Sequence, residues 1–300
     1  MPEAFTDARL ARIADKLAVA RVMTVRPTPF GSDVHKFELR PPLPETVVTE
    51  FEERHEIELP SGYRLFVTDL GDGGAGPGYR MRPLRDTCDG RCRPGHLARS
   101  SPYLPGPRYY GDWEQRHEDP PGPHRVFLPG TLWLADHGCT LHTQLIVTGP
   151  SRGRLFNLDV DGPVGPYVVE DQDFLAWYER WLDEAMTGYD VGWFGERLPL
   201  TEAELLQVLA ADAAPHRRIR AGESLLLLPA VSDRAWHALE HAARFDDDPV
   251  VRSALWEVLD STRPFDPPKI VPIPPSAVDA SAPEPTQFRH DPWAADPWAD

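Results

Sequence analysis

The stretch TLWLADHGCTLHTQLIVTGPSRGRLFNLDV, from Thr131 to Val160, decides the fold class of this chain. Three short apolar runs, at 132–134, 141–147 and 155–160, are separated by the turn-forming groups HGC and GPSRG. Such runs between glycine-containing turns are typical of consecutive antiparallel strands. The stretch therefore predicts an antiparallel meander, and we expect the β-rich part of the chain to end near 167–169.

A helix with an aromatic stripe is predicted directly after the meander. Apolar residues recur there at i, i+3, i+4, i+7 and i+8, which is the spacing of one buried helix face. These residues are Phe174, Trp177, Tyr178, Trp181 and Leu182. Asp171 or Asp173 is suited to cap the start of this helix, and Gly188 is suited to end it. We expect the stripe to pack on the meander as core, because a cofactor site would need polar groups on the same face.

The part of the chain before the meander is predicted to be helical. Residues 1 to about 26 have apolar positions at helical spacing, and we assign 1–35 as an N-terminal helical extension. Two short helices follow, the first with a stripe of Val47, Val48 and Phe51 and the second with a buried side of Phe66, Val67 and Leu70. Ser61 is the predicted N-cap of the second of these helices, and Gly71 is predicted to end it with a positive φ.

The remaining segments are a long loop, a helical region and a tail. Residues 82–127 lack periodicity, and a connection of that length in a compact domain is usually functional or mobile. Residues 199–263 contain four short helical segments, with Ser232 and Asp248 as predicted N-caps, and this arrangement suggests two copies of a helix pair. Residues 264–300 are rich in proline, alanine and aspartate, so we predict that they are disordered.

Composition excludes several classes of protein. The chain has 300 residues, 41% of them hydrophobic, and a formal net charge of −16, which argues against binding to phosphate backbones. The N-terminal residues have no continuous apolar region, and apolar runs such as Leu225–Leu228 are far too short for a membrane span. Three cysteines cannot form a complete disulfide framework, which favours a reducing compartment. We therefore expect a cytoplasmic protein.

One glycine-rich motif resembles a nucleotide-binding signature. Residues Gly71–Gly76 match G-x-G-x-x-G. That motif needs a strand before it and a helix after it, so that a pyrophosphate meets the helix N-terminus. Here a helix is predicted before the glycines, and Pro77-Gly78 follows them. We interpret the motif as a tight connection from a helix to a strand.

Two patterns contain potential zinc ligands. His237, Glu240 and His241 form an H-x-x-E-H pattern, but a third ligand and a cleft are also needed, and we expect these histidines on a solvent-facing helix side. Cys88, Cys92 and His96 lie in a glycine-rich loop, where His117, His124 or Cys139 would have to supply a fourth ligand. We interpret these as ordinary loop residues.

The sequence predicts no catalytic residue, metal site or cofactor. It contains neither a nucleophile elbow nor a cysteine-nucleophile signature. Asp159 and Asp161 at the end of a strand are interpreted as turn residues rather than as an acid/base pair.

Several ordered motifs within residues 36–187 resemble the SMI1/KNR4 family, a branch of the SUKH superfamily. The N-terminal part of the resemblance is carried by a proline-rich joint at 40–44, then Phe51-Glu52-Glu53-Arg54, Leu59-Pro60-x-x-Tyr63-Arg64-x-Phe66 and Gly71-Asp72-Gly73-Gly74-Ala75-Gly76-Pro77. The C-terminal part is carried by Gly138-Cys139, Leu145-Ile146-Val147-x-Gly149-Pro150-x-x-Gly153 and Phe174-Leu175-x-Trp177-Tyr178-Glu179-x-Trp181-Leu182. Asp72 stands where the family commonly has asparagine, and 82–127 is longer than the family core needs. Separately, 200–263 is similar to HEAT-type repeats.

The resemblance implies an α+β fold in which SUKH-type helices pack on a predominantly antiparallel sheet, followed by a small all-α HEAT-like region. It implies a protein-binding module rather than an enzyme. Bacterial members of the family are similar to immunity proteins that neutralise toxin domains, often nucleases, and eukaryotic members act as regulatory hubs. An acidic surface would speed the encounter with a basic nuclease.

Six residues are the predicted partner contacts: Glu52, Glu53, Asp72, Gly73, Gly74 and Tyr79. A solvated helix face is the alternative interpretation of the glutamates. The alternative function is a scaffold that recruits partners through its helical repeats and through the Asp-Pro-Trp-Ala copies at 291–294 and 296–299. A minor alternative is a zinc hydrolase built on the H-x-x-E-H helix.

Overall fold

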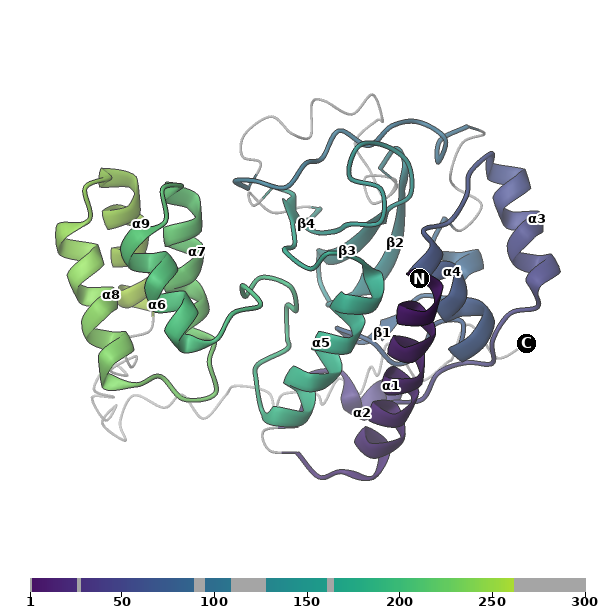
Figure 1. Cartoon of the computed structure of the whole chain (residues 1–300), viewed down its shortest axis with the longest axis horizontal. Helices are drawn as coiled ribbons and strands as arrows, with labels where there is room; N and C mark the ends of the chain where they lie inside the picture. Colours follow the sequence, from purple (N-terminus) through teal and green to yellow (C-terminus); the bar gives the residue numbers. More distant parts are fainter. Residues whose placement is uncertain (1, 26–27, 89–94, 109–127, 161–164, 262–300) are drawn as a thin grey trace, which may run out of the picture. The chain divides into compact units, whose positions relative to one another are not determined.

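The computed structural model of the chain describes residues 2–25, 28–88, 95–108, 128–160 and 165–261 (Figure 1). Residues Met1–Thr262 form one compact unit that mixes helices with a five-stranded sheet. The α+β class is therefore confirmed. Residues 264–300, including both Asp-Pro-Trp-Ala copies, lie outside the described residues, as do Cys92, His117, His124 and Asp161.

The sheet is an antiparallel meander in which every strand pairs with the next in the sequence. Its strands are β1 (Arg80–Met81), β2 (Thr131–Asp136), β3 (Leu141–Ile146), β4 (Leu155–Asp159) and β5 (Tyr167–Val168). The three central strands coincide with the apolar runs of the sequence, so the predicted meander is confirmed. A register shift between Trp133 and Ala135 interrupts the pairing of β2 with β3.

Helix α5 (Phe174–Thr187) covers one face of this sheet, as its aromatic stripe predicts. Asp173 caps its start by accepting a hydrogen bond from the backbone N–H of Ala176 at 2.8 Å, and Gly188 ends it with φ 83°. Trp177 and Trp181 are fully buried. Helix α1 (Pro2–Val22) lies beside α5 (Figure 1) and contributes Ile13 to the same hydrophobic cluster.

The opposite face of the sheet has its own apolar cover. Phe156 and Leu158 of β4 pack there with Tyr103 and Leu128, whereas Leu155 belongs to the cluster on the α5 side. The described parts of 82–127 thus contribute to the core, although the sequence predicts only a long loop. They include a short 3-10 helix, η2 (Leu84–Asp86).

The glycine-rich turn connects a helix to a strand, as interpreted from the sequence. Helix α4 (Ser61–Leu65) continues into the π-helix η1 (Phe66–Leu70), and β1 follows the turn. Two local predictions are wrong. Ser61 is the first helical residue rather than the N-cap, and Gly71 is extended at φ 168°. A glycine is needed at position 71 for a steric reason instead, because a Cβ there would overlap the carbonyl oxygen of Arg40.

Two further helices precede this turn. Helix α2 (Ser32–His35) begins after Gly31, and α3 (Glu45–His55) begins after Pro44. Val48 and Phe51 form the buried side of α3, as the sequence predicts, whereas Val47, which the sequence places in the same stripe, is exposed. The glutamates of α3 face outward except for Glu52.

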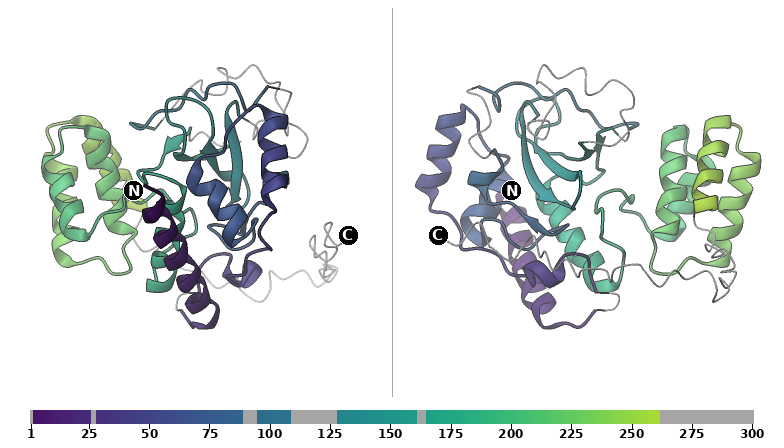
Figure 2. Two further views of the ribbon diagram at one scale, coloured as in Figure 1. Left: turned by 45° about the vertical axis from the view of Figure 1, so that its right-hand side comes forward. Right: turned by 180° about the vertical axis from the view of Figure 1, so that it is seen from behind.

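The C-terminal part of the described chain is built from four helices (Figure 2). They are α6 (Glu202–Ala211), α7 (Pro215–Leu226), α8 (Asp233–Phe245) and α9 (Pro249–Ser261). Helix α6 packs on α7 and on α8, and α9 packs on α8 and on α7, which is the contact pattern of two stacked helix pairs. Ser232 caps α8 as predicted. Gly222 lets α7 and α9 approach closely, because a Cβ there would overlap Leu255.

Candidate functional site

Asp72, Gly73 and Gly74 lie together in the glycine-rich turn, where they shape the backbone. Asp72 is buried and accepts a hydrogen bond from the backbone N–H of Leu84 at 2.6 Å. Burial raises the pKa of this carboxyl, against the opposing effect of that hydrogen bond. Gly73 and Gly74 have φ values of 79° and 94°, and a Cβ on either would meet backbone atoms. The turn is therefore packed against its surroundings rather than presented to solvent.

The other three predicted contact residues are Glu52, Glu53 and Tyr79. Glu52 and Glu53 belong to α3, and Tyr79 follows the glycine-rich turn. Glu52 of α3 is bound within the protein, because it accepts hydrogen bonds from the backbone N–H of Leu59 at 2.8 Å and from Nε of Arg64 at 3.1 Å. Glu53 is exposed. Tyr79 is 44% exposed and packs on Phe30, with ring centroids 5.0 Å apart. Glu53 and Tyr79 are thus the predicted contact residues with exposed side chains.

Neither zinc pattern gathers a set of ligands in the part of the chain that the structure describes. That part contains no group of three or more His, Cys, Asp or Glu able to hold a metal ion. His237, Glu240 and His241 are exposed on α8. The interpretation of Cys88 as an ordinary loop thiol is wrong, because Cys88 is disulfide-bonded, whereas Cys139 is free and exposed.

A cavity of about 1010 Å³ is lined by residues of α7 and α9, and we call it the α7–α9 pocket. Its lining includes four half-buried apolar residues that we call its floor: Ile219 and Leu227 of the α7 segment, and Ala254 and Val258 of α9. Its remaining lining residues are Pro107, Arg108, Tyr167, Trp193, Glu196, Pro215, His216, Arg220, Glu223, Asp248, Val250, Glu257 and Ser261.

Two arginines in the lining of the α7–α9 pocket share a carboxylate, and we call this cluster the charged end of the pocket. Glu196 forms ion pairs with Arg108 and with Arg220, the latter at 2.8 Å from Nη1. Both guanidinium groups also lie over the ring of Tyr167, at 5.2 Å and 4.1 Å from its centroid. Burial opposes the charge of Arg220, but Glu196 overcomes this effect and raises the pKa of its guanidinium. The charged end is therefore rigid and internally neutralised.

A buried chain of hydrogen bonds connects this end to the centre of the sheet. Asn157 of β4 donates to Oε1 of Glu196 at 3.1 Å and accepts from the hydroxyl of Thr143 of β3 at 2.7 Å. Nε2 of His137 lies 2.8 Å from the same hydroxyl. Burial lowers the pKa of His137 to about 4, so the ring is neutral at pH 7. The sheet thereby fixes the position of Glu196.

The lining of the α7–α9 pocket also contains three acidic residues, Glu223, Asp248 and Glu257, which we call its rim. Val250, another lining residue, is 62% exposed. Glu223 also pairs with Arg220 at 3.0 Å. An apolar floor inside an acidic rim is suited to a ligand that combines apolar side chains with positive charge.

Sequence reasoning missed this pocket because its parts are far apart in the chain. Arg108, Tyr167, Glu196 and Arg220 belong to four different segments, and none of them lies in a recognisable motif. The available signal was the mixture of Leu and Glu in 215–261, which is also what any amphipathic helix pair would show.

A comparison with protein-family models, with curated proteins and with solved structures finds no significant match to this chain. Within the described ranges, none of the helices combines the length and the apolar character required to cross a lipid bilayer.

Proposed function

We propose that this protein is a binding module whose α7–α9 pocket receives a basic, partly apolar segment of a protein partner. The observation that carries the proposal is the apolar floor of Ile219, Leu227, Ala254 and Val258 inside the rim of Glu223, Asp248 and Glu257. The rigid Arg108–Glu196–Arg220 end gives such a segment a fixed boundary.

The energetic terms of such an interface are of ordinary size. Each apolar side chain that becomes fully buried on the floor contributes about 1.5–3 kcal/mol. The rim charges, together with the net charge of −16 of the whole chain, would steer a basic partner and raise the association rate at low salt. Affinity would therefore come from the floor, and the rate of encounter from the rim.

The class of partner is proposed from the resemblance to the SMI1/KNR4 family. That resemblance supports an immunity-type protein in the cytoplasm that binds and neutralises a toxin domain, such as a nuclease, without catalysing a reaction. A nuclease that binds phosphate backbones carries the basic surface that an acidic rim complements.

A regulatory scaffold is the second candidate function. It is favoured by the four C-terminal helices, which have a hydrophobic cluster of their own and still expose Phe245 and Trp256. Stacked helix pairs offer long surfaces for protein ligands. Deleting 264–300 separates the two candidates: loss of a binding partner favours the scaffold, and unchanged toxin neutralisation favours the immunity protein.

The test is co-expression of the full chain with the protein encoded beside its gene, with growth rescue and the dissociation constant as readouts. Two variants change the exposed side of the α7–α9 pocket, Glu257→Lys and Val250→Asp. Two matched variants make the same changes on α3, Glu53→Lys and Val47→Asp, where Val47 is 42% exposed.

We expect each pocket variant to weaken binding at least tenfold and each α3 variant to leave it unchanged. The reverse pattern would move the site to the acidic helix α3, where Glu53 is a predicted contact. No rescue and no complex with any neighbouring gene product would contradict the immunity function.

A further inference from the structure

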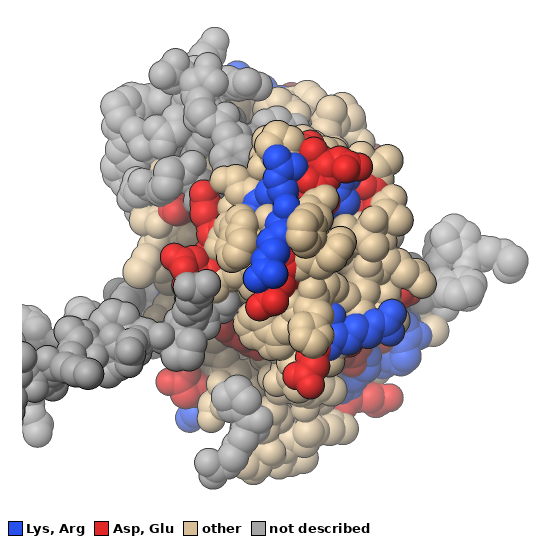
Figure 3. All heavy atoms as spheres, turned by 90° about the vertical axis from the view of Figure 1, so that its left-hand side faces the viewer, with Lys and Arg blue, Asp and Glu red and all other residues tan. Residues whose placement is uncertain are grey.

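A second, smaller cavity opens between α6 and α8, on a face that the α7–α9 pocket does not use. Its volume is about 460 Å³, and we call it the α6–α8 groove. Leu206, Leu209 and Ala210 line it from α6, and Ala238 and Ala242 line it from α8. Figure 3 shows the face of the molecule on the side of these helices, where basic, acidic and uncharged residues lie close together.

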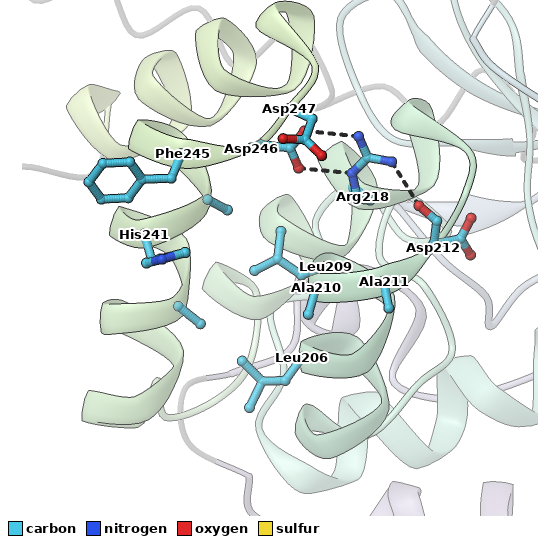
Figure 4. A pocket seen from close by; sticks show the side chains of 12 residues that line it. Leu206, Leu209, Ala210, Ala211, Asp212, Arg218, His241, Phe245, Asp246 and Asp247 are labelled. Atoms are coloured by element: carbon cyan, nitrogen blue, oxygen red, sulfur yellow. Dashed lines mark hydrogen bonds and ion pairs between the residues drawn. The ribbon is translucent and has the colours of Figure 1, made fainter.

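A large aromatic side chain, Phe245, belongs to the lining of this groove, together with Ala211, Asp212, Arg218, His241, Asp246 and Asp247. Phe245, near the end of α8, is 66% exposed, the second-highest exposure among the exposed large hydrophobic residues of the described chain. In Figure 4 it projects from the same helix as His241, away from Leu206 and Leu209 on α6, and the two rings are 5.1 Å apart. The same face therefore carries both a projecting ring and a hollow whose apolar lining is made of leucine and alanine side chains.

The helix end that holds Phe245 is fixed by an ion pair. Arg218 of α7 binds both carboxylate oxygens of Asp246, at 2.8 Å and 2.9 Å, and donates to the carbonyl oxygen of Asp212 at 2.7 Å (Figure 4). Bidentate arginine–carboxylate pairs impose a specific geometry. The exposed position of Phe245 is thus built into the packing of α6, α7 and α8.

We propose that this face is the contact between two copies of the chain, with the α8 helices antiparallel and each Phe245 inserted in the α6–α8 groove of the other copy. A two-fold interface joins the same patch on both subunits, so the patch must complement itself. A projecting ring beside an unfilled hollow meets this requirement.

The register follows from the spacing of α8. Arg234, His237, His241 and Phe245 form one exposed stripe at intervals of three and four residues. A two-fold axis between His241 and Ala242 places Phe245 opposite Ala238 of the second copy, which lines the groove.

The charges of the stripe agree with this register. The same axis brings Arg244 within one residue of Glu240 of the second copy. Arg234 comes within one turn of the acidic run Asp246–Asp248 across the axis. Opposite charges therefore meet along both halves of the paired helices.

The size of the contact sets the expected strength. A buried aromatic side chain removes on the order of 150–250 Å² from water, so two Phe245 rings and a pair of helix faces make an interface near the lower end of specific contacts, about 1,200 Å². We therefore expect a dimer that dissociates at micromolar concentration.

The test is sedimentation velocity on the full chain from about 1 to 500 μM, together with two single substitutions. Phe245→Asp should be monomeric over the whole concentration range, because the inserted ring is lost. Since Phe245 is exposed, the substitution should leave the fold intact, and thermal unfolding checks this. Val47→Asp on α3 is the matched control and should dimerise like the unchanged chain.

A charge exchange tests the register. Glu240→Arg and Arg244→Glu should each weaken the dimer about tenfold, and the double variant should restore it. A wild-type chain that stays monomeric at 500 μM, or a Phe245→Asp chain that dimerises normally, overturns the proposal. A double variant that stays weak overturns the antiparallel register. Val250→Asp should leave the dimer intact, which separates this test from that of the α7–α9 pocket.

Discussion

Nη1 of Arg220 lies 2.8 Å from the carboxylate of Glu196, which also binds Arg108, and all three side chains are almost completely buried. The pair connects α7 to the segment that follows α5, and through Asn157 to the sheet. One carboxylate therefore bridges two cations, Glu223 supplies the second negative charge through its pair with Arg220, and the cluster positions one end of the α7–α9 pocket.

The first prediction is that Glu196→Gln destabilises the protein by about 3–5 kcal/mol, because removing one partner leaves buried charges without compensation. Chemical denaturation at pH 7 measures the change. Glu53→Gln on the exposed side of α3 is the control and should shift the free energy of unfolding by less than about 0.5 kcal/mol. Equal effects of the two substitutions would contradict a structural role for Glu196.

Acid should destabilise the fold through two buried histidines, His35 and His137. Burial lowers the pKa of each from 6.5 to about 4, and Nδ1 of His35 accepts the backbone N–H of Phe37 at 3.0 Å. Below pH 6.5 the unfolded chain takes up protons that the folded chain does not. Stability is therefore lost as the pH falls from about 6.5 to about 4, by about 1.4 kcal/mol per pH unit for each histidine.

Urea midpoints between pH 4 and pH 8 measure this loss. His137→Gln should reduce the slope in that window, because it removes one of the two buried rings. A flat stability profile between pH 4 and pH 6.5 would show that neither ring is held neutral.

Asp72→Asn should stabilise the protein at pH 7 and have little effect at pH 3. Burial raises the pKa of Asp72 in the folded chain, so its ionisation costs stability as the pH rises, and an amide oxygen can accept the same hydrogen bond from Leu84. Asp72→Ala removes that acceptor and should cost about 1–3 kcal/mol at either pH. Thermal unfolding of the three proteins at both pH values gives the comparison.

Gly71→Ala should cost about 1–3 kcal/mol through overlap with Arg40, since inserting a methyl group into a packed site forces the backbone to move. Gly95→Ala is a useful contrast, because its Cβ would meet nothing within 4 Å and its φ of 73° is the sole source of strain. If Gly71→Ala unfolds at the same temperature as the unchanged chain, the close approach at Arg40 is not rigid.

The elements that the sequence predicts well are those with a strong period. The strands at Thr131–Asp136, Leu141–Ile146 and Leu155–Asp159 are apolar runs between turn signals, and α5 has an unbroken aromatic stripe. Their hydrophobic pattern and the tertiary packing agree, so local information is sufficient.

The sequence is less informative about positions whose conformation or burial is determined by tertiary contacts. A glycine at the position of Gly71 is typical of a helix C-terminus with a positive φ. In the structure η1 is a π-helix, and Gly71 follows it in an extended conformation, in close contact with Arg40. Leu84, Leu97 and Tyr103 are buried, although the sequence around them has no helical or strand periodicity that would predict this. The site was missed for the same reason: Glu196 acquires its role from Arg108 and Arg220, which only folding brings to it.

Leu255 packs directly against the backbone of α7 at Gly222, and this contact bears on which partners the pocket can accept. The two helices cannot come nearer to one another, and a bulkier residue at 222 would wedge them apart. The close approach at Gly222 therefore fixes the width of the α7–α9 floor. A partner would then be selected by the size of its side chains as well as by their charge.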